Sequence, residues 1–569
     1  MDVIKAALQL GLKAHTSIAI HAEESSHSYL QLMQSALSLS SELKTILSCH
    51  RRQVPNDPLP NRSFHGSHTV EVDPPRVGII AKPSAEFVAG LWATWLCKGI
   101  AVPLALSYPE AELLHVLTDA EVSVVLGTPD HESRLLEASR KASSQFCLLP
   151  RVKIFDGANQ GDTDESAPSY VIDQLTGLSD IEGTTPGLIV YTSGTTGKPK
   201  GVVHTHSGMN AQVKMLSEAW QYSKDDRFLH CLPLHHVHGL FNGLLAPLYA
   251  GAMVEFLPKF SVKGVWRRWM ESYPSEGVKE SRAITVFTGV PTMYAYLLQG
   301  YKTMDVDAQK VAASAARQLR LMMSGSSALP LPVMSEWEAL TGHRLLERYG
   351  MTEVSKLSSL IAVSLSFVMA LSNPYSGQRK AGTVGNPLPG VEVKIIDDDP
   401  AVPGTGELCV KSPSLFKEYW RRPEVTKESF GEDGYFRTGD SATRDDDGYY
   451  IILGRSSVDI MKVGGFKLSA LEIEAVLLEH PFIAECAVLG LPDIYYGEII
   501  CAVVVLSDEA KSQAAANGDP PLTLSGLKSW AKERMAPYKA PARLEIWEEM
   551  PRNALGKVNK KDLKKRLTI

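Results

Sequence analysis

The segment Tyr191–Gly201, with the sequence YTSGTTGKPKG, constrains this chain more than any other part of it. It holds three glycines, two lysines and four serine or threonine hydroxyl groups, and it directly follows the apolar run Gly187–Val190. Glycines let successive backbone N–H groups turn toward an anion, while hydroxyl groups and lysines add donors and positive charge. A strand that leads into such a loop predicts a polyphosphate site. The glycine spacing fits neither the Walker nor the Rossmann motif, and the alternative, a flexible linker, rarely follows a buried strand.

Short apolar runs alternate with helical patterns through the first half of the chain. The runs are Val77–Ala81, Ala101–Leu106, Val122–Leu126, Leu188–Tyr191, Ala283–Phe287 and Leu319–Met323. This alternation predicts an α/β fold of parallel sheets wrapped by helices. We expect one crossover helix at Lys82–Leu96, and surface loops in the polar stretches Cys49–Pro75 and Asp156–Gly183.

The second half of the chain changes pattern twice. After about Val391, strands and turns predict a β-rich subdomain, and a new α+β unit begins near Gly454–Ser457. Because 569 residues exceed one ordinary core, we predict a large N-terminal domain at 1–454 and a small C-terminal domain at 455–569. The elements predicted for the small domain are a helix at Ala470–Glu479, strands at Ala484–Gly490 and Glu498–Leu506, a helix at Leu524–Arg534 and a strand at Arg543–Trp547.

Composition excludes several classes of protein. The hydrophobic and charged fractions, 44% and 21%, are those of a water-soluble globular protein, and the net charge of −6 argues against a general nucleic-acid binder. The basic tail Lys557–Arg566 is expected to be a solvated helix end, apart from Lys557. Seven cysteines without Cys-x-x-Cys spacing predict neither a zinc site nor a disulfide framework. We find no transmembrane span and no targeting pattern, so the expected location is cytoplasmic, with an organelle form from an upstream start as the alternative.

Five segments resemble, in order, the motifs of one family. They are Thr192–Lys200 (TSGTTGKPK), Tyr349–Glu353 (YGMTE), Tyr435–Asp440 (YFRTGD), Gly454–Arg455 followed by Lys462–Lys467 (KVGGFK), and Pro551–Lys557 (PRNALGK). Together they are similar to the AMP-forming acyl-CoA synthetases, the adenylate-forming superfamily. Five matches spread from the middle of the chain to its end are far more specific than one.

The resemblance implies a two-step reaction. A carboxylate attacks the α-phosphate of ATP to give an acyl-adenylate and pyrophosphate, and the thiol of coenzyme A then displaces AMP. Positioning and placed positive charge catalyse such phosphorus chemistry. The small domain is expected to be mobile and to serve each step in a different conformation. No carrier domain follows, so free coenzyme A is the expected thiol and the expected partners are small molecules.

Roles carry over residue by residue. The resemblance implies that the phosphate loop consists of Thr192, Ser193, Gly194, Thr195, Thr196, Gly197, Lys198, Pro199 and Lys200. Glu353 and Thr196 would bind Mg²⁺, Thr352 would contact the α-phosphate, and Tyr349, Asp440 and Arg455 would line the nucleotide pocket. Lys557 would serve the adenylation step, and Gly464 and Gly465 would let the coenzyme A thiol pass. Mg²⁺ favours carboxylate and phosphate oxygens, and one carboxylate can accept both ribose hydroxyls. Taken singly, each residue also has a plain structural reading, such as a surface carboxylate for Glu353.

Further segments, among them Leu232–Phe241, Ser324–Pro330 and Gly342–Tyr349, extend the resemblance over nearly the whole chain. Within the family they are most similar to malonate–CoA ligases of the plant type. Malonate keeps a second carboxylate, and burying that charge unpaired is prohibitive, so the pocket needs a cation or several donors. The candidates in or beside the matching segments are His236, His238, Ser326, Arg320 and Arg344. Alternatives remain: methylmalonate or an aromatic acid as substrate, surface salt bridges for the two arginines, and a metal site for the three histidines of Pro233–Phe241.

One segment departs from the family pattern. Val354–Ser366 is apolar and hydroxyl-rich, and it separates Glu353 from a segment that the family places almost directly after this glutamate. We interpret it as retained intronic sequence; the alternative is a genuine loop of this lineage. Because it follows the expected Mg²⁺ ligand, a second hypothesis is a folded, catalytically impaired isoform that still binds nucleotide.

Overall fold

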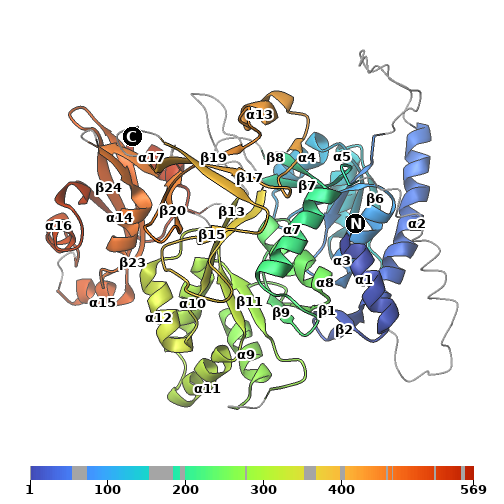
Figure 1. Ribbon diagram of the computed structural model, residues 1–569, viewed down its shortest axis with the longest axis horizontal. Coiled ribbons are helices and arrows are strands. Elements are labelled where there is room, and N and C mark those ends of the chain that lie inside the picture. Colours follow the sequence, from blue (N-terminus) through green and yellow to red (C-terminus); the bar gives the residue numbers. More distant parts are fainter. Residues whose placement is uncertain are drawn as a thin grey trace.

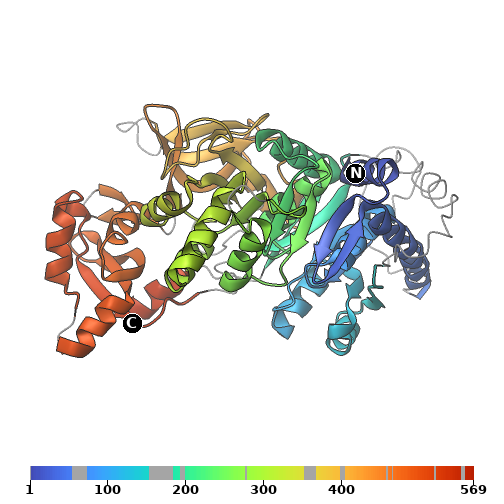
Figure 2. The ribbon, with the colours of Figure 1, turned by 90° about the horizontal axis from the view of Figure 1, so that it is seen from below.

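The computed structural model describes residues 2–53, 73–152, 183–192, 199–275, 279–351, 367–397, 404–455, 459–463, 466–517, 521–552 and 558–568. Up to Arg455 these residues form a large body, and the later ones form a smaller body at one end of the molecule (Figure 1). The view from below shows the same two parts, with the N-terminus at the end opposite the small body (Figure 2). None of the described helices is long and apolar enough to cross a membrane.

Two large sheets build the first part of the large body. In spatial order one contains β18 (Glu418–Tyr419), β8 (Lys200–Thr205), β7 (Pro186–Thr192), β4 (Ile100–Pro103), β3 (Arg76–Ile80), β5 (Val122–Gly127) and β6 (Gln145–Leu148). The other contains β15 (Asn386–Pro387), β14 (Phe367–Ser372), β13 (Leu346–Met351), β12 (Leu321–Ser324), β11 (Val286–Gly289), β9 (Arg227–His230), β10 (Met253–Phe256), β1 (Ile18–Ala22) and β2 (Ser25–Ser28). The nine-stranded sheet is parallel at its centre and antiparallel at both edges. The seven-stranded sheet is antiparallel only at the edge formed by β18, β8 and β7, and parallel from β7 to β6.

Helices cover these sheets and fill the space between them. They are α1 (Asp2–Lys13), α2 (Tyr29–Gln53), α3 (Ala85–Leu96), α4 (Glu110–Asp119), α5 (Glu132–Lys141), α7 (His206–Ala219), the π-helix η3 (His238–Leu245), α8 (Ala246–Ala250), α9 (Val262–Ser272), α10 (Pro291–Lys302), α11 (Val306–Arg317) and α12 (Leu331–Thr341). α3 and α7 contact strands of both sheets, so they form a layer between them. One continuous apolar core therefore joins the two sheets.

A third, antiparallel sheet forms the β-rich subdomain, and the small body follows it. The third sheet contains β16 (Glu392–Asp397), β17 (Thr405–Lys411), β19 (Phe436–Arg444) and β20 (Tyr450–Arg455), with α13 (Pro423–Glu428) beside it in sequence. The small body contains β21 (Ile460–Val463), β22 (Phe466–Ser469), α14 (Ala470–Leu477), β23 (Ile483–Asp493), β24 (Gly497–Leu506), α15 (Asp508–Asn517), α16 (Leu524–Lys532), β25 (Arg543–Trp547) and α17 (Lys560–Thr568). The predicted α/β fold, with its β-rich subdomain and small α+β unit, is confirmed.

The boundaries differ from the predicted ones where side chains make local contacts. The expected helix Lys82–Leu96 begins at Ala85, because Ser84 caps it by accepting a hydrogen bond from the Phe87 N–H at 3.3 Å. α2 extends to Gln53 and so takes the first residues of a stretch predicted to be a loop. Most of the basic tail lies in α17, but Lys560, the first residue of this helix, is largely shielded from water. The Lys560 ammonium lies 2.6 Å from carboxylate oxygens of both Asp459 and Glu474.

Candidate active site

The nucleotide residues expected from the sequence meet where β13 passes the third sheet. Tyr349, on β13, donates a hydrogen bond from its hydroxyl to the Asp440 carboxylate at 2.7 Å. Arg455 approaches the other oxygen of the same carboxylate, at 3.9 Å from its Nε. Burial, and then the Asp440 charge, raise the pKa of Tyr349 well above its usual value. Two residues, Tyr349 and Arg455, thus approach the two oxygens of one nearly buried carboxylate.

The two ends of the candidate phosphate loop lie next to each other. β7 and β8 form an antiparallel hairpin in which Thr192 pairs with Lys200. The carbonyl oxygen of Pro199 lies 2.9 Å from Nε2 of His115. Burial, together with the Arg422 guanidinium, lowers the pKa of Lys200. The hairpin therefore fixes where the loop begins and ends.

A separate polar cluster lies at the carboxyl ends of parallel strands of the larger sheet. His238, the first residue of η3, contacts the Ser326 hydroxyl through Nδ1 at 2.9 Å and the Thr288 hydroxyl through Nε2 at 2.8 Å. The Arg348 guanidinium contacts both Thr288 and His238. Thr288, Ser326 and Arg348 come from or just after the neighbouring strands β11, β12 and β13, and ligands of α/β proteins bind at this edge of a sheet.

Arg348 is the one cation of this cluster. Its side chain is 3% exposed, and burial lowers its pKa to about 10. Its guanidinium lies 5.4 Å from the centre of the Trp220 ring. Among the described residues no carboxylate pairs with it, and its Nε has no hydrogen-bond partner. A buried guanidinium so surrounded by hydroxyl and ring groups is suited to a small anion.

Arg320 and Arg344 are held elsewhere. Arg320 binds the Asp226 carboxylate with Nε at 2.5 Å and Nη2 at 2.6 Å. Arg344 binds Glu338 at 2.9 Å and is exposed. Both arginines precede their strands and so lie toward the amino ends of β12 and β13. Six residues of extended chain, about 20 Å, separate Arg320 from Ser326. Arg320 and Arg344 therefore lie away from the cluster, because they precede their strands and because carboxylates bind their side chains there.

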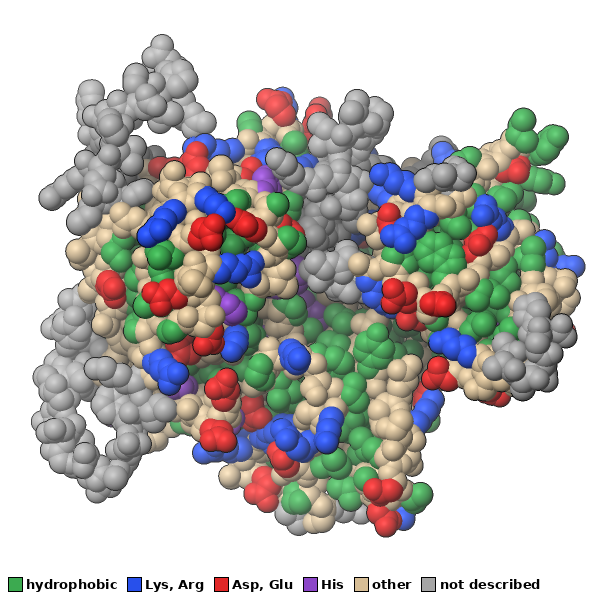
Figure 3. Space-filling model, turned by 180° about the vertical axis from the view of Figure 1, so that it is seen from behind, with side chains coloured by type: hydrophobic (Ala, Val, Ile, Leu, Met, Phe, Trp, Pro, Cys, Tyr) green, Lys and Arg blue, Asp and Glu red, His purple; other side chains and the backbone are tan. Residues whose placement is uncertain are grey.

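The other candidates divide into two groups. His236 is half-buried, and its ring centre lies 4.1 Å from that of His235. Figure 3, the view from behind, shows histidine side chains at the centre of the molecule. Among the described residues no three metal-binding side chains are grouped to hold an ion. The candidates Ser193, Gly194, Thr195, Thr196, Gly197, Lys198, Thr352, Glu353, Gly464, Gly465 and Lys557, and the segment 354–366, lie outside the described residues.

Sequence reasoning missed Arg348 and Thr288. Arg348 directly precedes the motif Tyr349–Glu353, but the arginine chosen as a candidate in this region was Arg344. The sequence places Arg348 beside the apolar and aromatic residues Leu346 and Tyr349, and in the structure residues 345–349 are all buried, with Gly350 half-buried. Charged residues are almost never fully buried without a partner, so this pattern marks a functional candidate.

Comparisons with known proteins agree with this geometry. A model of the family "AMP-binding enzyme" matches residues 71–420, which is more than half of the chain, and a model of the "AMP-binding enzyme C-terminal domain" matches residues 472–557. The chain belongs to the AMP-binding enzyme family. Within it, a malonate–CoA ligase of Arabidopsis thaliana is 56% identical, over 100% of this chain and 89% of the relative.

Solved structures of AMP-binding enzymes share the fold. ATP-bound MatB from Rhodopseudomonas palustris superposes with a TM-score of 0.76 at 29% identity, covering 99% of each chain. A malonyl-CoA ligase in a ternary product complex with methylmalonyl-CoA and AMP gives a TM-score of 0.59 at 33% identity, over 94% of this chain and 97% of that one.

Proposed function

We propose that this AMP-binding enzyme joins malonate to coenzyme A. ATP activates one carboxylate as malonyl-adenylate, releasing pyrophosphate, and coenzyme A displaces AMP to give malonyl-CoA. The observation that carries the choice of acid is the buried Arg348 guanidinium, which contacts Thr288 and His238 and pairs with no carboxylate among the described residues. The Arabidopsis thaliana relative named malonate–CoA ligase supports it.

The carboxylate of malonate that does not react is the natural partner of this cluster. Arg348 supplies the positive charge, while Ser326 and Thr288 supply hydroxyl groups that can donate. Pairing removes the cost of burying either charge alone, which is about 3–5 kcal/mol when one partner is missing. A monocarboxylic acid offers no such partner, so discrimination against it follows from the same cost.

The nucleotide fits the opposite face of β13. Successive residues of a strand point to opposite sides, so Arg348 faces the acid cluster and Tyr349 faces Asp440. We assign the ribose hydroxyls to Asp440, with Arg455 beside it, and the phosphates to the loop between Thr192 and Lys200. One strand then separates the two binding sites, and its carboxyl end leads to where the acid and the α-phosphate would meet.

Other roles rest on family resemblance alone. We assign Mg²⁺, which neutralises phosphate charge when bound, to Glu353 and Thr196, the adenylation step to Lys557, and the coenzyme A channel to Gly464 and Gly465. The domain boundary at 454–455 and the cytoplasmic location likewise remain predictions.

Methylmalonate is a second candidate substrate. The malonyl-CoA ligase that shares this fold was solved with methylmalonyl-CoA bound. An added methyl group leaves both carboxylates in place, so the Arg348 argument holds equally for this acid.

AMP formation against a panel of acids tests the proposal. We expect malonate or methylmalonate to give the highest kcat/KM, ahead of acetate, butyrate and benzoate. Arg348→Met should lower kcat/KM for malonate by about a hundredfold or more, because the distal carboxylate loses its charged partner. Arg344→Met, which breaks an exposed ion pair with Glu338 and an exposed hydrogen bond to the Arg379 carbonyl, is the matched control and should change kcat/KM less than about threefold.

Two outcomes would reject the proposal. A monocarboxylic acid as the best substrate would remove the argument from Arg348. ATP binding by the purified chain without pyrophosphate release on any acid would instead support the impaired isoform.

A further inference from the structure

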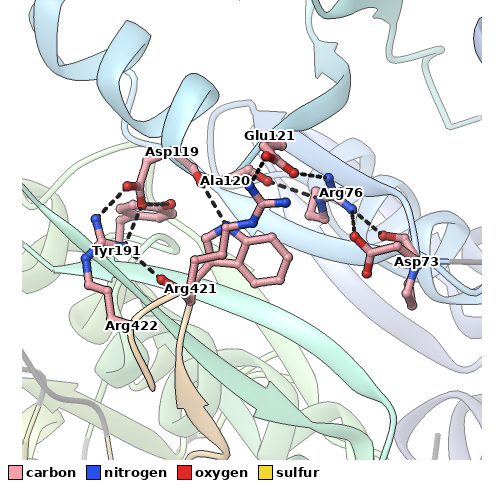
Figure 4. Close-up of polar contacts among 10 residues, drawn as sticks. Asp73, Arg76, Asp119, Ala120, Glu121, Tyr191, Arg421 and Arg422 are labelled. Atoms are coloured by element: carbon pink, nitrogen blue, oxygen red, sulfur yellow. Dashed lines mark hydrogen bonds and ion pairs between the residues drawn. The ribbon is translucent and has the colours of Figure 1, made fainter. Parts of the chain in front are cut away.

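The last residue of α4, Asp119, lies beneath the hairpin that carries the candidate phosphate loop. Its carboxylate accepts a hydrogen bond from the Tyr191 hydroxyl at 2.7 Å and from Nη2 of Arg422 at 2.6 Å (Figure 4). Its backbone oxygen accepts a third bond, from Nε1 of Trp420 at 2.8 Å. The side chain is 15% exposed, so these contacts form largely away from water.

Two of these partners, Tyr191 and Trp420, lie at opposite sides of the loop. Tyr191 is on β7, one residue before Thr192. On the other side, the backbone N–H of Trp420 donates to the Gly201 carbonyl at 2.9 Å, and β18 continues this pairing along β8. Asp119 therefore connects directly to the strand that enters the loop and, through Trp420, to the strand that leaves it.

Gly201 shows how closely the two strands are packed at this point. It pairs with Tyr191 across the hairpin, and the Tyr191 ring lies over it. A Cβ at this position would lie 2.8 Å from Cγ2 of Ile189 and 3.0 Å from Cζ of Tyr191. The glycine lets the Tyr191 ring approach the neighbouring backbone, and the ring is then held by Asp119.

Charge adds to the geometry. Arg422 lies close enough to Lys200 to disfavour its protonated form, and Asp119 balances this guanidinium. Without that carboxylate, Arg422 would lose its ion pair and could leave its place beside the hairpin.

We infer that Asp119 is a positioning residue for the nucleotide. Its carboxylate holds the entering end of the phosphate loop through Tyr191 and the leaving end through Arg422, which donates to the Trp420 carbonyl at 2.7 Å. The inference rests on the proposed function, because it takes this loop to bind ATP. A misplacement of about 1 Å near bound phosphates is enough to cost about a hundredfold in rate. Asp119 need not touch ATP itself.

A neighbouring network offers a matched control. Glu121, two residues further on, binds Arg76 at 3.0 Å and also pairs with Arg421 (Figure 4). It makes no hydrogen bond or ion pair with β7 or β8 among the described contacts. Glu121→Gln thus breaks ion pairs on the same turn but leaves the hairpin contacts intact.

The experiment compares Asp119→Asn, Tyr191→Phe and Glu121→Gln with the unmodified full chain. The measurements are ATP binding by calorimetry without any acid, KM for ATP, KM for malonate and thermal midpoint. We expect Asp119→Asn to weaken ATP binding and raise KM for ATP about tenfold, the factor that corresponds to losing a hydrogen bond to a charged group. Tyr191→Phe should act in the same direction by a smaller factor. KM for malonate should stay within about twofold, and Glu121→Gln should leave ATP binding unchanged.

Three results would overturn the inference. They are a lower thermal midpoint in Asp119→Asn with unchanged ATP affinity, an equal loss of ATP affinity in Glu121→Gln, and an equal rise of both KM values. If Asp119→Asn does not fold, Tyr191→Phe decides: it removes one hydroxyl, and unchanged ATP binding would reject the role. Because calorimetry needs no acid, a failure of malonate as substrate is distinguishable from a failure of this inference.

Discussion

Glu347 and Arg348 are neighbouring charged residues inside β13, and both are nearly excluded from water. Glu347 is 7% exposed, and its Oε1 accepts a hydrogen bond from the Gly382 N–H at 3.1 Å. Among the described residues it has no cationic partner. Burial raises the pKa of this carboxyl to about 8. Arg348 is also a charged residue buried away from water. Hydroxyl and ring groups contact it and, as we propose, the substrate carboxylate pairs with it.

The raised pKa of Glu347 predicts a pH-dependent loss of stability. The unfolded chain releases this proton near pH 4.5, whereas the folded chain keeps it until about pH 8. Between these values the folded state binds more protons, so the free energy of unfolding falls as pH rises. Glu347→Gln removes this dependence. We expect the stability of the variant relative to the native chain to improve between pH 6 and 8, by up to about 1.4 kcal/mol per pH unit.

Urea unfolding of both chains at pH 6, 7 and 8 measures this difference. Comparing the two chains cancels the contribution of the other groups, including the buried histidines. A constant difference across the three pH values would mean that Glu347 is ionised in the folded chain throughout.

At the scale of elements, the antiparallel pair β13 and β14 fixes the two points that the segment Val354–Ser366 has to connect. The two strands are antiparallel, with Arg348 opposite Ser372 and Met351 opposite Phe367. All residues from 352 to 366 therefore connect two strand ends that are already paired. Removing 354–366 leaves Thr352 and Glu353, and two residues form the shortest common connection between antiparallel strands.

Deleting Val354–Ser366 should raise turnover and the thermal midpoint. A shorter connection lowers the entropy cost of closing the hairpin, by about 1–2 kcal/mol. It also places Glu353 at a fixed distance from β14, beside the proposed acid and nucleotide sites. Turnover with malonate and thermal midpoint, measured on identically prepared forms, check this. A lower midpoint together with lower turnover would show that the segment belongs to the native structure, and transcript reads through it would agree.

At the scale of the whole molecule, an unbroken chain of polar contacts runs from the large body into the small one. Arg455 lies beside Asp440, and its backbone N–H donates to the Asp459 carboxylate at 3.0 Å. Asp459 in turn pairs with Lys560, which begins α17 three residues after Lys557. The proposed ribose site is thereby connected to the helix that follows the proposed adenylation lysine.

Lys557→Ala should separate the two half-reactions. If Lys557 serves only adenylation, pyrophosphate release should fall about 10²–10³-fold, the usual cost of removing one donor at developing charge. Thioester formation from supplied malonyl-adenylate should stay within a few-fold of the native rate. Quenched-flow assays of each step provide the measurement, with Arg566→Ala on α17 as a control that removes only an exposed ion pair. Equal losses in both steps would contradict the assignment of two conformations.

The sequence by itself determined the architecture and brought out residues of the proposed nucleotide site. Its apolar runs at Val77–Ala81 and Val122–Leu126 became β3 and β5, because a strand buried on both faces must be apolar whatever surrounds it. The motif residues Tyr349, Asp440 and Arg455 lie together, and their proposed roles rest on short local patterns. Local periodicity and motifs need no knowledge of distant contacts.

Tertiary structure alone decided which charges are paired. In the sequence Arg320, Arg344 and Arg348 are equivalent cations; in the fold Asp226 and Glu338 bind the first two, and the third is buried with no described carboxylate beside it. Likewise Lys560 looks like part of a solvated tail until Asp459 and Glu474, far apart in sequence, surround it. The free energy of a charge depends on its neighbours in space and on its exposure to water, and neither quantity is encoded in the residues next to it along the chain.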